Sequence, residues 1–148
     1  MPANTPSSLR LRKLLFASLL VLIGVAIVVA ITQNKQWNIP EEAKSRQNPL
    51  QPSSSNLAAA GAIYIEKCAN CHGETGKGNG PDAASYYPAP TNLTDTNHIN
   101  SVTDGEIFYQ ISQGRKPMPA FKRKLSEEQR WQLVLFVRSL AASRPPSR

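Results

Sequence analysis

The sequence holds few residues of the kinds that bind metal ions. Among its 148 residues are two cysteines, two histidines and two methionines, one of which is Met1. A structural zinc site takes four Cys or His ligands, usually arranged as two pairs. Cys68 and Cys71 form one pair, but beyond His72 the chain offers only His98 for a second. The ligand count therefore argues against a zinc site.

Several sequence patterns are also absent. No strand-like alternation precedes Cys68, although a thioredoxin-type redox disulfide follows a strand and opens a helix. No basic helix occurs, and no aromatic residues are interleaved with a basic stripe, so we predict no nucleic-acid partner. The formal net charge of +7 does not change this conclusion, because residues 57–142 carry nine Lys and Arg against eight Asp and Glu.

The most informative motif is Cys68-Ala69-Asn70-Cys71-His72. Cys-x-x-Cys-His is the pattern of covalent c-type haem attachment. Two thiols three residues apart on one helical turn can form thioethers with the two vinyl groups of one porphyrin, and the next imidazole can bind the iron. A plain structural disulfide would leave the histidine without a role. The motif predicts one covalent haem c, held through Cys68 and Cys71, with His72 as an iron ligand.

A second ligand is predicted from the loop around Met118. This methionine lies between Pro117 and Pro119 in an otherwise polar stretch. Methionine is most often flexible core filler, but the two prolines stiffen the loop, and a rigid loop suits a distal iron ligand. A thioether is a weak, soft donor, and Met/His ligation raises the reduction potential of a haem. We predict Met118 as the sixth ligand, with His98 as the alternative.

The N-terminal part of the chain contains an uncharged apolar run. Residues 14–31 are long enough to be a membrane-span candidate. Arg10, Arg12 and Lys13 precede them, which places the N-terminus in the cytoplasm by the positive-inside rule. A cleaved secretory signal is the alternative, although the run exceeds the usual ~7–15-residue core of such a signal. Both interpretations export the rest of the chain, so we predict a single-pass protein of the inner (cytoplasmic) membrane with its functional domain on the periplasmic side.

The segment after this run is rich in Pro, Ser, Asn, Gln and charge and poor in apolar residues. Such a composition buries too little surface to offset its ordering entropy, which predicts a flexible linker. The domain that follows is small, so we expect it to fold poorly without the apolar surface of a bound haem. The predicted organisation is a cytoplasmic N-terminus (1–13), a transmembrane anchor or signal peptide (14–31), a flexible linker (32–56), a haem domain (57–142) and a disordered tail (143–148).

Three helices are predicted in the haem domain. Alanines favour a helix over residues 57–68, a capping box at Thr103 and Glu106 opens a second that stops at Gly114, and Ser126 caps a third. The third helix carries an apolar face that we expect to cross the first helix near Tyr64. That face consists of Leu133, Phe136, Val137 and Leu140, while a glycine-rich loop at Gly73, Gly76, Gly78 and Gly80 follows the first helix.

These residues resemble the class I c-type cytochromes, which are small, helical and carry a single haem. The resemblance covers residues 57–142 and rests on the motif at 68–73, on residues 114–121 and on the start of the last helix. It implies an all-α, cytochrome c-like haem domain. By the same resemblance, the backbone carbonyl of Pro90, or alternatively of Pro88, accepts the proton of the His72 ring. The family usually has a glycine where this chain has Ala60.

The resemblance implies a single-electron carrier in a membrane-associated respiratory chain, and not an enzyme. A fixed cytochrome c subunit of a larger membrane redox complex is one alternative. A ligand-binding or catalytic haem protein is another, and it would need an open distal site. The expected partners are a redox donor and a redox acceptor, which dock on a cluster of cations around the Met118 loop. This basic rim consists of Arg115, Lys116, Lys122, Arg123 and Lys124.

Overall fold

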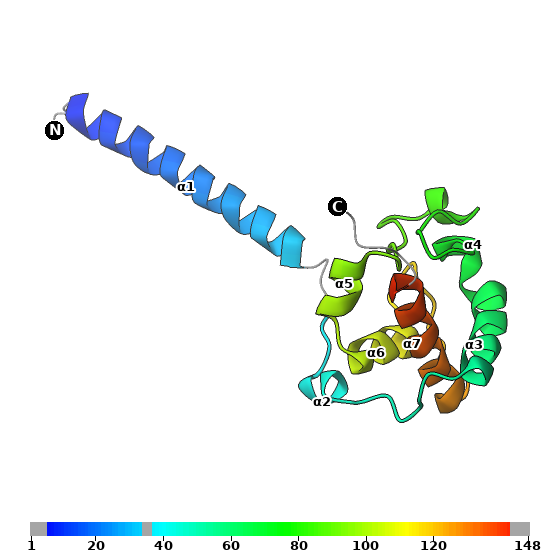
Figure 1. Cartoon of the computed structure of the whole chain (residues 1–148). Coiled ribbons are helices and arrows are strands. Elements are labelled where there is room, and N and C mark those ends of the chain that lie inside the picture. Colours follow the sequence, from blue (N-terminus) through cyan, green and yellow to red (C-terminus); the bar gives the residue numbers. More distant parts are fainter. Residues whose placement is uncertain (1–5, 34–36, 143–148) are drawn as a thin grey trace. The chain divides into compact units, whose positions relative to one another are not determined.

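The computed structural model describes residues 6–33 and 37–142, which fall into two compact units, Met1–Asn38 and Ile39–Arg148. The first unit is one long helix, and the second is a group of short helices (Figure 1). Helices and turns account for all the regular structure in the described ranges, apart from one isolated bridge between Arg115 and Met118. The prediction of an all-α chain is confirmed.

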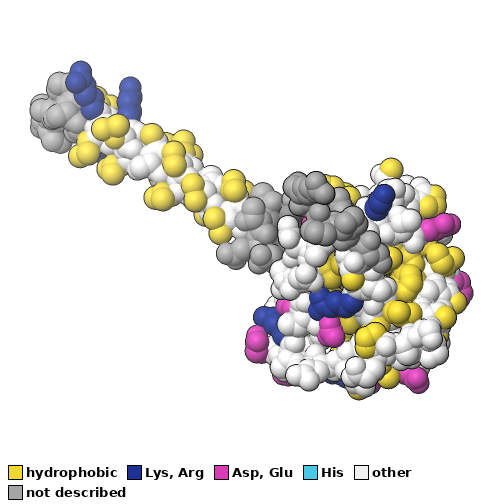
Figure 2. All heavy atoms as spheres, viewed as in Figure 1, with side chains coloured by type: hydrophobic (Ala, Val, Ile, Leu, Met, Phe, Trp, Pro, Cys, Tyr) yellow, Lys and Arg dark blue, Asp and Glu magenta, His cyan; other side chains and the backbone are white. Residues whose placement is uncertain are grey.

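The first unit contains the helix α1, Pro6–Gln33. Its segment Leu9–Val29 has a mean hydropathy of 2.3 and none of it is buried, so by length and composition it can cross a membrane. Figure 2 shows hydrophobic side chains along the described part of α1 and Lys and Arg side chains toward its N-terminal end. The apolar run expected at residues 14–31 lies inside this helix.

The second unit is built around the contact of its first long helix with its last. Tyr64 and Phe136 meet there with ring centroids 4.9 Å apart, so the predicted crossing near Tyr64 is confirmed. Ala60 is completely buried. The helices of this unit are α2 (Glu41–Lys44), α3 (Ser54–Lys67), α4 (Ala69–His72), η1 (Ala83–Ser85, a 3-10 turn), α5 (Thr96–Ser101), α6 (Asp104–Gln113) and α7 (Glu127–Ala142).

Side-chain caps set the beginnings of the longer helices. The capping box of Thr103 and Glu106 is present at α6, and Ser126 accepts a hydrogen bond from the backbone N–H of Gln129 ahead of α7. Both caps were predicted. Helix α3 begins three residues earlier than expected, because the Ser53 hydroxyl accepts the N–H of Asn56 and so supplies a cap before the alanine run.

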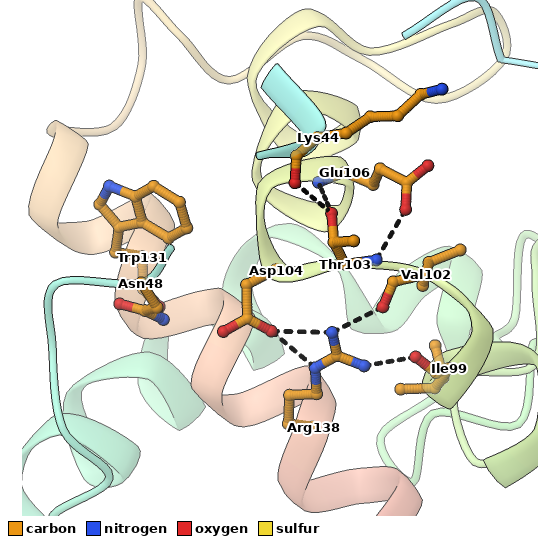
Figure 3. Close-up of polar contacts among 9 residues, drawn as sticks. All are labelled: Lys44, Asn48, Ile99, Val102, Thr103, Asp104, Glu106, Trp131 and Arg138. Atoms are coloured by element: carbon orange, nitrogen blue, oxygen red, sulfur yellow. Dashed lines mark hydrogen bonds and ion pairs between the residues drawn. The ribbon is translucent and has the colours of Figure 1, made fainter. Parts of the chain in front are cut away.

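Arg138 ties three helices together, as Figure 3 shows. Its guanidinium donates to the Asp104 carboxylate at 2.8 Å, to the carbonyl of Val102 at 2.7 Å and to the carbonyl of Ile99. The side chain therefore satisfies the carbonyl of Ile99, which lies in α5, and that of Val102, which follows α5. It also pairs with Asp104, the first residue of α6. A planar guanidinium with five donors suits this role better than an ammonium would.

The prediction of a flexible linker over residues 32–56 is wrong from Ile39 onward, because the compact second unit begins there. From Ile39 to Leu50 the chain packs against the rest of the second unit, and we call this segment the strap. The guanidinium of Arg46 lies 4.6 Å from the centre of the Phe108 ring and 5.1 Å from that of Trp131. The composition of the segment concealed this, because an arginine stacked on aromatic rings orders a chain without adding any apolar residue.

Backbone contacts also hold the strap against α6. Figure 3 shows the Thr103 hydroxyl donating to the carbonyl of Lys44, at 2.8 Å. At Gly105 a Cβ atom would lie 2.0 Å from the carbonyl oxygen of Ala43, so only glycine permits this approach. The compact unit consequently begins at Ile39 and not at Leu57.

Candidate haem site

The Cys-x-x-Cys-His motif lies where α3 gives way to α4. Cys68 ends α3, its N–H donating to the carbonyl of Tyr64 at 2.8 Å, and its own carbonyl accepts the N–H of His72 at 2.9 Å. The single turn of α4 thus carries Cys71 and His72 directly after Cys68. Both cysteines are free thiols and are half-buried. The structure brings together the three residues that the motif predicted as haem attachment points.

The glycine-rich loop wraps the turn that carries the motif. The backbone N–H of Gly78 donates to the carbonyl of His72 at 2.7 Å, and that of Gly80 donates to Cys71 at 3.1 Å. A Cβ atom at Gly80 would lie 2.3 Å from the carbonyl oxygen of Asn70 and 2.4 Å from that of Ala69. No side chain fits at this position, so the glycine lets the loop close on α4 and fix the motif.

The imidazole of His72 is held by a backbone carbonyl, but not by the expected one. Its Nδ1 lies 3.0 Å from the carbonyl oxygen of Thr91. The prediction that the carbonyl of Pro90, or of Pro88, faces this ring is therefore wrong. Pro90 is one residue away from the observed partner. The carbonyl of Pro90 instead faces Gly78, where an added Cβ would approach it to 2.5 Å. A carbonyl can only accept, so Nδ1 carries the proton and Nε2 keeps the lone pair that binds a metal.

The same loop positions the Thr91 carbonyl. The N–H of Leu93 donates to the carbonyl of Gly76 at 2.7 Å, which joins the segment after Pro90 to the glycine-rich loop. The Asn92 side chain accepts the N–H and the hydroxyl of Thr94, which closes the turn. Sequence reasoning found the correct segment but could not tell which carbonyl faces the ring, since that depends on this pairing between two loops.

Burial shifts the ionisation of all three motif residues toward the neutral form. Desolvation lowers the pKa of His72, which outweighs the hydrogen bond to Thr91. Desolvation, with Cys71 nearby, raises the pKa of Cys68 to about 11. Desolvation and the Asp82 carboxylate raise the pKa of Cys71 as well. A neutral imidazole is the form that binds iron, so the environment of His72 suits a ligand.

Tyr64 supports the site from the core. Its hydroxyl donates to the carbonyl of Gly73, the residue after His72, at 2.7 Å, and the side chain is 1% exposed. Burial raises the pKa of this phenol, which stays protonated as a donor. The sequence placed Tyr64 at the helix crossing but gave no signal for this hydrogen bond.

We predict that Tyr64→Phe destabilises the protein by about 0.5–1.5 kcal/mol, because it removes one of the two donors to the buried Gly73 carbonyl, which keeps the N–H of Gly76 at 3.0 Å. Thermal unfolding followed by circular dichroism measures this loss. Tyr109→Phe is the matched control, since it removes the same atom from α6. Equal stability of the Tyr64 and Tyr109 variants would show that the hydrogen bond to Gly73 does not support the site.

The predicted distal ligand lies in the loop after α6. The N–H of Met118 donates to the carbonyl of Arg115 at 2.8 Å, and the N–H of Phe121 anchors the end of the loop on Ile111 at 3.1 Å. Met118 is half-buried and packs against the hydrophobic core, as Cys68 does. His98, the alternative, is exposed on α5, where its N–H donates to the Asp95 carboxylate. Met118 therefore packs against the core, whereas His98 is exposed.

The apolar surroundings of these residues fit a haem. Figure 2 shows hydrophobic side chains gathered on the surface of the second unit where α3, α4 and α7 meet. A porphyrin is a large apolar disc that such a surface can cover, while the thiols, the imidazole and the thioether are the donors that a c-type haem uses. The half-buried hydrophobic side chains that pack against the core include Ile63, Cys68, Leu93, Met118, Phe136 and Leu140.

An all-α unit with a haem-attachment motif on one helical turn and a methionine on the same apolar cluster defines a c-type cytochrome domain. Residues 55–137 match the family described as cytochrome c oxidase, cbb3-type, subunit III, and the chain belongs to that family. Residues 55–137 thus form a cytochrome c domain of the family that carries covalently bound haem c.

Among the proteins that resemble the chain are three curated relatives and a solved structure. It is 34% identical over 83 residues to the cbb3-type cytochrome c oxidase subunit FixP of Bradyrhizobium diazoefficiens. It is 23% identical over 107 residues to the cytochrome bc1 complex cytochrome c subunit of Corynebacterium efficiens. It is 31% identical over 84 residues to cytochrome c6 of Leptolyngbya boryana. The reducing HAO-like protein complex of Kuenenia stuttgartiensis is similar in structure, with a TM-score of 0.55 and 30% identity.

These matches cover different shares of each protein. The aligned parts take in 55% of this chain and 27% of FixP, and 72% of this chain and 33% of the bc1 subunit. The match to cytochrome c6 takes in 56% of this chain but 91% of that protein. The structural match covers 62% of this chain and 46% of the Kuenenia chain. The shared part is thus one haem domain, which in cytochrome c6 makes up nearly the whole protein.

Proposed function

We propose that this protein passes single electrons between partners of a membrane-bound respiratory chain and transforms no substrate itself. Cys68 and Cys71 would hold the haem, and His72 and Met118 would bind its iron. The observation that carries the proposal is the His72 ring, whose Nδ1 is bound by the Thr91 carbonyl so that Nε2 is left for the metal. When bound, the haem supplies an iron that takes up and releases one electron.

The ligand pair decides between electron transfer and chemistry at the iron. A gas sensor or a peroxidase needs an open coordination position, whereas a methionine that fills it leaves only outer-sphere electron exchange. Met118 is on a loop that backbone hydrogen bonds anchor, and it packs against the core, which supports it as the residue that would fill this position. This favours the electron carrier over the catalytic alternative.

The helix α1 serves as the membrane anchor in this proposal. Arg10, Arg12 and Lys13 lie at its N-terminal end, so the positive-inside rule orients the N-terminus toward the cytoplasm. The haem domain then lies on the periplasmic side of the inner membrane. FixP and the bc1 cytochrome c subunit carry the names of complex subunits, which supports a respiratory setting for this chain too.

Redox cycling in native membranes tests this function. Isolated membranes should reduce the haem when a respiratory substrate is added without oxygen and reoxidise it when oxygen is admitted. The reason is that an electron carrier within a respiratory chain is reduced and reoxidised as respiration proceeds. A haem that remains in one redox state throughout active respiration would contradict the proposal.

The basic rim is the proposed docking surface for an acidic redox partner. Lys116, Lys122, Arg123 and Lys124 are exposed, and Arg115 is half-buried. The Lys124 ammonium also lies 5.9 Å from the centre of the Phe121 ring, which keeps it beside the Met118 loop. Such a cluster steers association through long-range attraction.

Replacing all five rim cations with glutamine should lower the rate of association with the partner by about tenfold or more at low ionic strength. The difference should shrink as salt is added, because exposed charges are screened. Stopped-flow measurement of electron transfer over a range of salt concentrations gives both results. Lys44→Gln, a cation on α2, is the control and should leave the rate unchanged. Equal rates for wild type and the rim variant at low salt would exclude steering by the rim.

A further inference from the structure

The strap, Ile39–Leu50, changes the length of chain that connects α1 to the haem domain. Helix α1 ends at Gln33 and the strap begins at Ile39, so residues 34–38 alone connect them. Six peptide steps span at most about 20 Å even when fully extended. A flexible linker over residues 32–56 would instead reach about 80 Å at full extension. The docked strap removes most of that reach.

Three kinds of contact hold the strap, and they lie along its length. Arg46 stacks on Phe108 and Trp131 and also donates to the Glu127 carboxylate at 2.5 Å. The Asn48 amide donates to the carbonyl of Trp131 at 3.0 Å. Each contact is modest in strength, but they act on the same short segment, so the strap docks as one piece.

Further contacts complete the strap at its two ends. Ile39 is buried at the start, and Leu50 packs against the hydrophobic core at the other end. The hydrogen bond from Arg46 lowers the pKa of Glu127, so this carboxylate stays ionised at neutral pH. The close approach of Ala43 to Gly105 adds a fit that any side chain at that glycine would break. Nothing in the haem chemistry requires these contacts.

We propose that the strap restricts the reach of the haem domain and so dedicates it to a redox partner held in the same membrane. The inference rests on the proposed function, since it takes α1 as the anchor. A carrier that exchanges electrons with soluble proteins gains from a long tether. A domain that serves a neighbouring membrane protein gains from a short tether, because a short tether raises the effective concentration of the haem domain near that protein.

Two full-length variants lengthen the tether in different ways. Arg46→Ala combined with Asn48→Ala releases the strap, which leaves residues 34–52, nineteen in all, as flexible chain. Insertion of fourteen Gly and Ser residues between Gln33 and Ile39 gives a tether of the same length while every strap contact is kept. Gln47→Ala, an exposed strap position, is the matched control. Tryptic cleavage after Lys44 reports whether the strap is released.

The readout is the rate of haem oxidation by the partner in native membranes, with ferricyanide as a soluble oxidant for comparison. Effective concentration falls roughly as the −3/2 power of tether length, so nineteen residues in place of five should slow oxidation by about sevenfold in both variants. The ferricyanide rate and the rate of the Gln47→Ala variant should not change. Cleavage after Lys44 should become faster only in the strap-release variant.

Unchanged or faster oxidation in the insertion variant would overturn the inference. So would strap release that slows oxidation when insertion does not, because the effect would then come from the strap itself and not from reach. Wild-type haem that does not cycle with respiration would overturn the proposed function and this inference together. Cycling in wild type with unchanged rates in both long variants would overturn the inference alone.

Discussion

Replacing Cys68 and Cys71 together with serine abolishes the haem-stained band of this protein on a denaturing gel. A serine hydroxyl forms no thioether with a porphyrin vinyl group, so no haem remains attached once the chain is unfolded. These are the only two cysteines of the chain, and both are free thiols at the end of α3 and in α4. The expected loss is complete.

The same double variant is also expected to lose much of its stability. Half-buried apolar side chains such as Leu93, Phe136 and Leu140 would be left uncovered on the haem face. Apolar surface that returns to water costs about 25 cal/mol per Å². Limited proteolysis should cut the variant much faster than wild type. Immunodetection of the polypeptide controls for expression, and a haem-stained band of normal intensity in the variant would contradict covalent attachment.

The second large effect is expected for Met118→Leu. Leucine fills the same volume but donates no lone pair, so the distal position of the iron opens. The reduced variant should bind carbon monoxide rapidly, whereas wild type should not. The oxidised variant should also lose the charge-transfer band of an iron–methionine bond.

The reduction potential of the Met118→Leu variant should fall as well. Loss of the thioether, which favours ferrous iron, lowers the potential by on the order of 0.1–0.3 V, within the roughly 0.8 V span that axial ligation covers. Redox titration measures the shift. His98→Leu is the matched control and should change neither the potential nor the spectrum. If His98→Leu opens the site and Met118→Leu does not, then His98 is the distal ligand.

Features that depend on near neighbours in the chain could be predicted from the sequence. The capping boxes at Thr103 and Ser126 each need residues three positions apart, and both are present. The haem motif could be placed on one helical turn because its three residues also lie close together in the chain. The crossing at Tyr64 followed from the apolar face of the last helix.

Features that depend on contacts between distant segments could not be predicted. The strap is held by Arg46, whose partner Glu127 is 81 residues away, and the composition of the segment suggested only disorder. The carbonyl at His72 belongs to Thr91 and not to Pro90, because a hydrogen bond between Leu93 and Gly76 sets the register of that loop. Neither contact has a local pattern that a single sequence reveals.

The electron-carrier function is tested most directly by the oxidised-state absorption spectrum of the full-length protein, isolated from membranes and shown by haem staining to carry covalent haem. Wild type should show the charge-transfer band of an iron–methionine bond, and the band should be retained in His98→Leu and absent in Met118→Leu. A haem-stained wild-type protein that lacks this band and binds carbon monoxide rapidly when reduced would contradict this function, because its iron would then be open to ligands and not closed for electron transfer.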